Sequence, residues 1–170
     1  MNQMFLIVGA ITALGILILP MNRIVTHRDE ILISTEAMTT ATALAQEMLE
    51  EISVRKYDQL YSGTGQKTSN ASDFTPAGSL GRDAGEIKDS VETFSDIDDF
   101  NQCRRTYSTP HLGIFTVLDS VYYVNNTSPY AKSSSQTFLK RIDVKVWNPY
   151  IMTSDSTITV SKIISYRYKG

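Results

Sequence analysis

The stretch LILPMNRIVTHRDEILIS, residues 17–34, joins an apolar run to a polar segment without a visible linker. From Met4 to Leu19 the chain carries no charged residue, and the polar exception is Thr12. Beyond this run, apolar residues recur at every seventh position: Ile24, Ile31, Met38, Ala45 and Ile52, with Ala41 and Met48 on the intermediate turn. This spacing predicts a narrow apolar stripe along a continuing helix.

Residues 21–62 contain neither Gly nor Pro, so nothing in the sequence ends the helix early. We therefore predict one helix over residues 1–55, with an apolar half (1–21) and an amphipathic half (22–55). Pro20 is expected to bend or loosen it, because the proline ring removes one backbone donor. The second half of the stripe is expected to pack on the chain's own domain, whereas the first half has nothing of its own to pack on.

Residues 56–112 are interpreted as a variable loop region, because they are dense in Gly, Ser, Thr and Asn and show no periodicity. Within it, the acidic segment FSDIDDFNQ (94–102) offers Asp96, Asp98 and Asp99 as candidate calcium ligands. Their spacing lacks the Gly turn and the distal Glu of an EF-hand loop. A solvated or helix-capping turn is the favoured interpretation, and no metal is expected.

From residue 113 to 170 the period changes to two. Three runs rich in β-branched and aromatic residues predict antiparallel strands: IFTVLDSVYYVNN (114–126), QTFLKRIDVKVWN (136–148) and STITVSKIISYRY (156–168). In the second run Ile142 and Val144 share the face that also carries Lys140, opposite Arg141 and Asp143. In the third run a slip in alternation suggests a bulge. Together these patterns predict an α+β fold, a long helix packed on a C-terminal antiparallel sheet.

Composition and motifs exclude several functions. The net charge is -2, so no nucleic acid is expected as a partner. The single Cys103 cannot form an internal disulfide and is expected to be a small buried side chain. Neither His27 nor His111 has the neighbours of a catalytic triad, and no phosphate-binding glycine motif occurs. We therefore expect no catalytic residues, no cofactor and no enzymatic activity.

The apolar run raises the question of membrane insertion. The residues around it lack the basic start and the small-residue cleavage site of a secretory signal peptide, which favours a retained membrane helix. Arg23, His27 and Arg28 follow the run and no basic residue precedes it. By the positive-inside rule this places the domain in the cytoplasm, unless a short basic leader has been removed.

The layout resembles the type IV pilin-like proteins, which include major pilins, minor pilins and the pseudopilins of type II secretion. The resemblance rests on the apolar first helix with Pro20, the amphipathic continuation, the variable loop and the final sheet. TALAQEMLEEISVRKYD (42–58) is similar to the helix end of minor pilins, and FLKRIDVKVWNP (138–149) with STITVSKIISYR (156–167) to their last two strands.

Two features depart from the family pattern. The family's peptidase site, a Gly preceded by a basic leader, does not occur. If Pro20 is matched to the family's helix-bending proline, Gln3 falls on a glutamate thought to neutralise a neighbour's terminal amine. Gln can form hydrogen bonds there but carries no charge. The same match starts the chain about two residues inside the usual mature end, so we expect a truncated start or an unconventional subunit.

The resemblance implies a structural subunit of an extracellular pilus-like filament, held in the inner membrane before assembly. Its partners would be copies of itself, joined through their first helices, and a pilus or secretion assembly machinery. Gly9, Ala10, Ala13 and Gly15 are expected to form a small-residue face at which these helices meet, together with Gln3 and Pro20. The alternatives are a minor pilin or periplasmic pseudopilin of a secretion system, and a membrane-anchored binding or sensor protein that never polymerises.

Overall fold

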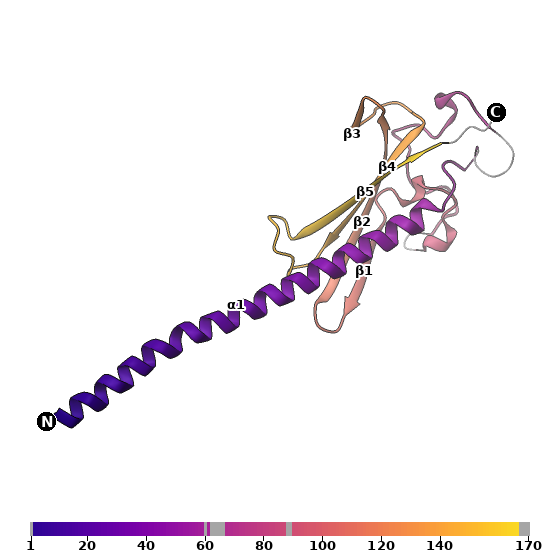
Figure 1. The fold of residues 1–170 in the computed structure, drawn as a ribbon. Coiled ribbons are helices and arrows are strands. Elements are labelled where there is room, and N and C mark those ends of the chain that lie inside the picture. The colour runs from indigo at the N-terminus through magenta and orange to yellow at the C-terminus, as the bar shows by residue number, and fades with distance from the viewer. Residues whose placement is uncertain (1, 60, 62–66, 88–89, 167–170) are drawn as a thin grey trace.

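The chain folds into one long helix and a five-stranded antiparallel sheet, with the sheet lying against the second half of the helix (Figure 1). This computed structural model describes residues 2–59, 61, 67–87 and 90–166. Within the helix, the side chains of seven residues lie outside that description: Asn2, Leu17, Leu19, Pro20, Asn22, Val25 and Thr26. The α+β class predicted from the periodicities is confirmed.

Helix α1 runs from Asn2 to Ser53 without interruption. The predicted continuous helix is therefore confirmed, ending two residues before the expected position. The helical backbone passes through residue 20, but the Pro20 side chain lies outside the described residues, so its expected bending role stays a prediction. Threonines do not break the helix, because each of the four with a described bond directs its hydroxyl to a carbonyl oxygen three or four residues earlier: Thr12, Thr35, Thr39 and Thr42.

The sheet contains β1 (Arg104–Thr109), β2 (Gly113–Asn125), β3 (Ser128–Lys132), β4 (Leu139–Trp147) and β5 (Thr157–Ser165). Its strand order is β1-β2-β4-β5, and β3 pairs with the end of β2. The three strands predicted after residue 112 are β2, β4 and β5. All of the strand pairs are antiparallel, as expected from the short connections.

The sequence did not predict two of the five strands, and the bulge expected in the run 156–168 is wrong. Strand β1 lies inside the segment interpreted as loop, and β3 lies between two predicted strands. Strand β1 (RRTYST) is an edge strand with polar residues on both faces, which hides the alternation that identifies a strand. The pairing of β5 with β4 is regular from Leu139 opposite Ser165 to Trp147 opposite Thr157, so there is no bulge in this pair.

The main core forms where the second half of α1 meets the sheet. The buried residues of α1 follow a spacing of three and four: Ser34, Ala37, Ala41, Ala45, Met48, Leu49 and Ile52. They pack with inward side chains of β2 and β4, among them Phe115, Ile142 and Val144. The three alanines let the helix backbone approach the sheet closely. The expected packing of the stripe's second half is thereby confirmed, although Met38 lies exposed at the margin.

A second, aromatic core lies beside the loop region. Tyr57, Phe74 and Tyr123 are buried together. The ring of Phe74 lies 5.0 Å from that of Tyr166, which follows β5. The Tyr123 hydroxyl donates a hydrogen bond to the carbonyl oxygen of Thr75. These contacts hold the described part of the loop region against the end of the sheet.

Candidate functional site

The first half of α1 projects beyond the sheet (Figure 1). Every described residue from Gln3 to Ile33 is exposed, and Ser34 is the first buried one. We call residues 2–33 the free half and residues 34–53 the packed half. Exposed large apolar side chains occur along the whole free half: Met4, Phe5, Leu6, Ile7, Val8, Ile11, Leu14, Ile16, Ile18, Met21, Ile24, Ile31, Leu32 and Ile33.

These side chains surround the helix rather than forming one stripe. Successive residues of an α-helix are rotated by about 100°, so the consecutive Met4, Phe5, Leu6 and Ile7 point to all sides. They are exposed by 77%, 75%, 72% and 59%. A helix that is apolar on every side is normally buried on every side. The free half therefore needs apolar surroundings that its own domain does not provide.

The predicted assembly residues lie in this free half, but they do not share one face. Gly9, Ala10 and Ala13 fall within an arc of about 100°, whereas Gly15 lies roughly 240° from Gly9, on another side. The expected single small-residue face is thus wrong for Gly15. A methyl group added at Gly9 or Gly15 would meet no atom within 4 Å beyond its chain neighbours and the backbone of its own helix. Gln3 is exposed near the start of the helix.

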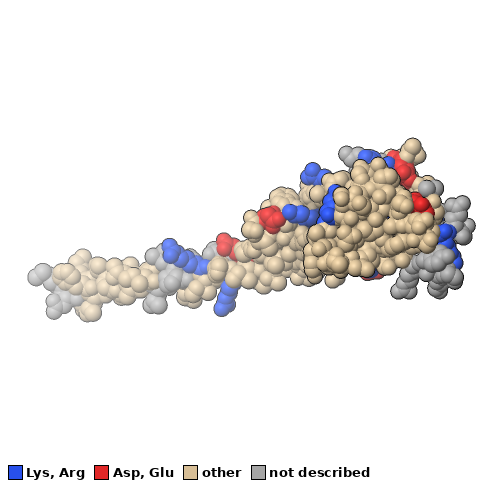
Figure 2. All heavy atoms as spheres, turned by 90° about the horizontal axis from the view of Figure 1, so that it is seen from above, with Lys and Arg blue, Asp and Glu red and all other residues tan. Residues whose placement is uncertain are grey.

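Charge begins only in the last third of the free half. Figure 2 shows Lys, Arg, Asp and Glu side chains near the domain and none towards the start of the helix. Further along the free half, His27 Nδ1 lies 3.6 Å from Glu30 Oε2, and both side chains are exposed. Among the described residues, no helix combines the length and apolarity needed to cross a membrane.

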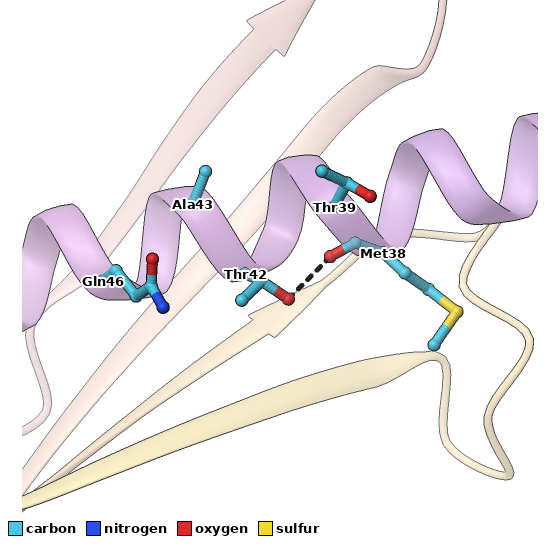
Figure 3. A pocket seen from close by; sticks show the side chains of 5 residues that line it. All are labelled: Met38, Thr39, Thr42, Ala43 and Gln46. Atoms are coloured by element: carbon cyan, nitrogen blue, oxygen red, sulfur yellow. Dashed lines mark hydrogen bonds between the residues drawn. The ribbon is translucent and has the colours of Figure 1, made fainter.

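The outward face of the packed half carries a shallow, open hollow of about 360 Å³. Its lining comes from α1 alone: Met38, Thr39, Thr42, Ala43 and Gln46 (Figure 3). The Thr42 hydroxyl is already bonded to the Met38 carbonyl oxygen at 2.8 Å. No titratable side chain lines the hollow, so it offers no acid, base or nucleophile for catalysis. It continues the exposed surface of the free half toward the domain.

The aspartates of the acidic segment 94–102 are buried, so its interpretation as a solvated turn is wrong. Asp96, Asp98 and Asp99 are 2%, 3% and 1% exposed. Asp98 Oδ1 accepts a hydrogen bond at 2.8 Å from Nζ of Lys140, the inward lysine of β4, which is itself fully buried. The lysine comes from a strand distant in sequence, which is why the local acidic pattern suggested exposure.

The neighbouring aspartates accept hydrogen bonds from backbone amides in and near this turn, but the N-cap position of its short helix is Ile97, which makes no side-chain cap bond. Asp96 Oδ1 accepts from the Asp98 amide at 2.9 Å, and Asp96 Oδ2 from the Gln59 amide at 2.6 Å. Asp99 Oδ2 accepts from the amides of Ser95 and Asp96. These bonds organise the short 3-10 helix η3 (Asp98–Phe100).

Burial and mutual contacts shift the pKa values of the three aspartates in different directions. Burial, with a hydrogen bond to the Asp98 carboxylate, raises the pKa of Asp96 to about 9. Burial raises the pKa of Asp99 to about 7, although bonds from backbone amides oppose the shift. For Asp98, burial acts in the same direction but is outweighed by the hydrogen bond with Asp96 and the charge of Lys140, so its pKa is lowered. At neutral pH the centre therefore holds a protonated Asp96 beside an ionised Asp98.

Among the residues described, no group of three or more His, Cys, Asp or Glu side chains is arranged to hold a metal ion. The candidate ligands Asp96, Asp98 and Asp99 instead bond to one another's backbone, to Gln59 and to Lys140. Cys103 is buried in the main core, as expected of a small apolar side chain.

A second, partly buried ion cluster joins the packed half to the sheet. Arg105 on β1 contacts Glu51 of α1 at 2.7 Å and Asp119 of β2 at 2.9 Å. Burial raises the pKa of Asp119 to about 6, more than the charge of Arg105 lowers it. Glu51 belongs to this cluster because β1, a strand that the sequence did not predict, brings Arg105 beside α1. The cluster is a structural contact between three elements.

Comparison with protein-family models, curated proteins and solved structures found no match for this chain.

Proposed function

We propose that the chain is a structural, non-enzymatic subunit of a type IV pilin-like filament. The observation that carries this proposal is the free half of α1, whose large apolar side chains are exposed on every side of the helix. Continuous apolar surface of this extent marks an interaction site in proteins. Copies of the same helix offer apolar surroundings of matching length and shape.

Burial of these side chains would stabilise a bundle of such helices. Full burial of one large aliphatic side chain contributes about 1.5–3 kcal/mol, so the free half offers tens of kcal/mol on burial. Thr12, the polar residue within the apolar run, donates its hydroxyl to the carbonyl oxygens of Val8 and Gly9 at 3.0 and 2.9 Å. Burial of this hydroxyl therefore leaves no donor without a partner.

The packed half connects the bundle to the outer domain. Because α1 is one helix, a force on the free half reaches the core through Ala41, Ala45 and Ile52. The ion contact between Glu51 and Arg105 adds a polar connection to the sheet. The domain would then lie on the outside of a filament whose centre is built from free halves.

The proposal includes the location of the subunit. Before assembly, the free half would hold the precursor in the inner membrane, with copies of the chain and an assembly machinery as partners. After assembly, the subunit would belong to an extracellular filament, or to a periplasmic pseudopilus if it is a minor component of a secretion system. No cofactor, metal or nucleic acid enters this function.

Electron microscopy of material sheared from cells that produce the chain tests the proposal. We expect filaments that are labelled along their length, or at one end for a minor subunit, by an antibody against the domain. The antibody should recognise the part of the chain after residue 55, which a bundle leaves outside. Recovery of the chain only as a detergent-soluble monomer would contradict the proposal and support a membrane-anchored binding or sensor protein.

A further inference from the structure

The centre formed by Lys140, Asp98 and Asp96 has no part in the proposed filament contacts. It lies where the end of α1, the turn before β1 and the start of β4 meet. Lys140 is fully buried, and a buried lysine is costly unless its charge is paired. The arrangement places an amine and two carboxyl groups in one buried site.

We propose that the Lys140 amine and the Asp98 carboxyl condense in the folded domain to an isopeptide bond, with Asp96 transferring the proton. Nζ of Lys140 lies 2.8 Å from Oδ1 of Asp98, which places it next to the carbon that it would attack. Reacting groups held at such distances gain the large effective concentrations of intramolecular reactions. The proposal does not depend on whether the chain polymerises.

Burial between aromatic rings makes a permanent ion pair costlier than a neutral amide. Nζ lies 4.5 Å from the centre of the Tyr57 ring and 5.4 Å from that of Tyr123, so aromatic rings enclose the amine. A buried ion pair keeps the cost of removing two charges from water, whereas an amide is neutral. Nζ also donates to the Tyr57 carbonyl oxygen at 2.5 Å. The N–H of the amide product can keep that bond, so the product leaves this carbonyl satisfied.

The reaction balances without any further reactant. A proton passes from the Lys140 ammonium to the Asp98 carboxylate, which gives a neutral amine and a neutral acid. The Nζ lone pair then attacks Cγ of Asp98, while the protonated Asp96, held beside it by the hydrogen bond from the Asp98 amide, donates to a carboxyl oxygen of Asp98. The C–O bond breaks, one oxygen leaves as water with a proton from Nζ, and Asp96 recovers its proton. The ammonium and carboxylate thus become an amide and one water.

Asp96 is suited to this role because its acid form persists at neutral pH. Burial and the bond to Asp98 raise its pKa to about 9. Its two oxygens are held by the amides of Gln59 and Asp98, which fixes the carboxyl beside the reacting groups.

The chain contains a matched control for the effect of burial. Lys145 Nζ and Asp155 Oδ2 lie 3.0 Å apart, but these side chains are 46% and 54% exposed. Water solvates both groups there and no neighbouring acid is bonded to the pair. We expect no condensation between Lys145 and Asp155, although the distance is nearly the same.

Intact-mass spectrometry of the purified full chain tests the proposal. We expect the wild-type mass to be one water below that calculated for its processed sequence, and a digest to contain one branched peptide joining Lys140 to Asp98. The bond should persist in denaturant. A folded wild-type chain with the full calculated mass would overturn the proposal, as would a link between Lys145 and Asp155 in its place.

Two variants separate the roles of the carboxyls. Asp98→Asn should still react, but with loss of ammonia rather than water, because the amide nitrogen becomes the leaving group. Asp96→Asn should remain uncondensed while circular dichroism shows mixed helix and sheet. Complete condensation of Asp96→Asn at the wild-type rate would overturn the role of Asp96. If either variant fails to fold, the wild-type mass and its branched peptide still decide whether the bond exists.

Discussion

The two halves of α1 belong to one helix but have opposite surroundings. Ile24 and Ile52 lie on the same seven-residue repeat, yet Ile24 is 55% exposed and Ile52 is fully buried. Both residues are isoleucine, so residue type does not explain the difference in exposure. The position of each residue relative to the sheet explains it, since the strands cover α1 only from Ser34 onward. The comparison teaches that an apolar residue indicates an interaction site when its own fold leaves it uncovered.

The halves also differ in the size of their side chains. The packed half buries small residues at Ala37, Ala41 and Ala45, which permit close contact with one flat sheet. The free half instead carries large residues all round, such as Phe5 and Leu14. One half is built for a single neighbour and the other for neighbours on several sides.

The largest expected effect on stability comes from truncating Ile52, with the exposed Ile24 for comparison. Ile52→Ala should lower the free energy of unfolding by about 2–5 kcal/mol, because it leaves a cavity in the core. Ile24→Ala is the matched control and should change it by no more than about 0.5 kcal/mol, as exposed substitutions usually do. Urea unfolding followed by circular dichroism measures both. Equal losses would show that the free half packs on its own domain.

Two alanines provide a comparison of the opposite kind, in which side chains are enlarged. Ala41→Leu should destabilise the domain by about 1–3 kcal/mol, since the added atoms overpack the helix against the sheet. Ala13→Leu should leave domain stability unchanged but shorten or abolish filaments, through overpacking between copies. Urea unfolding and filament length in electron micrographs separate these outcomes. Normal filaments from Ala13→Leu would remove Ala13 from the proposed helix contact.

Asp119, in the ion cluster between α1 and the sheet, should contribute part of the pH dependence of stability. Burial raises the pKa of Asp119 to about 6, so the folded state holds this proton more tightly than the unfolded state. The contribution of Asp119 to the free energy of unfolding is therefore greatest at acid pH. This contribution is lost as the pH rises from about 4 to 6, by at most about 1.4 kcal/mol per unit of pKa shift.

Asp119→Asn should remove this part of the slope when urea unfolding is measured at several pH values. Asp155→Asn is the exposed control and should leave the slope between pH 4 and 6 unchanged. An unchanged slope in Asp119→Asn would show that the ion contact with Arg105 outweighs burial.

The smallest effect on stability is expected at Gln3, which is exposed at the start of the free half. Gln3→Leu should leave unfolding unchanged and reduce filament number, because it removes a hydrogen-bonding group from the proposed contact with a neighbour's terminus. Gln3→Glu restores the residue type of the family that the sequence resembles and should preserve filaments. Counting filaments per cell in electron micrographs compares the two. Equal numbers in Gln3→Leu and wild type would exclude this contact.

Local periodicity in the sequence predicted the long helix and the faces of the strands. The absence of Gly and Pro from residues 21–62 predicted the uninterrupted helix, and alternation in β4 placed Lys140 on the same face as Ile142. Both succeed because helix and strand repeats place side chains on faces without reference to the rest of the chain. The expected centre of assembly also came from the sequence, through the long apolar run.

Tertiary structure alone decided which of these faces are covered. The burial of Asp98 depends on Lys140, 42 positions later in the chain, and Glu51 meets Arg105 only because β1 lies beside β2. A run of acidic residues looks solvated when it is considered alone, since its partner belongs to another element. The point at which α1 leaves the sheet is likewise set by the length of the strands that cover it. Periodicity assigns a residue to a face, but only packing between distant segments determines whether that face meets protein or solvent.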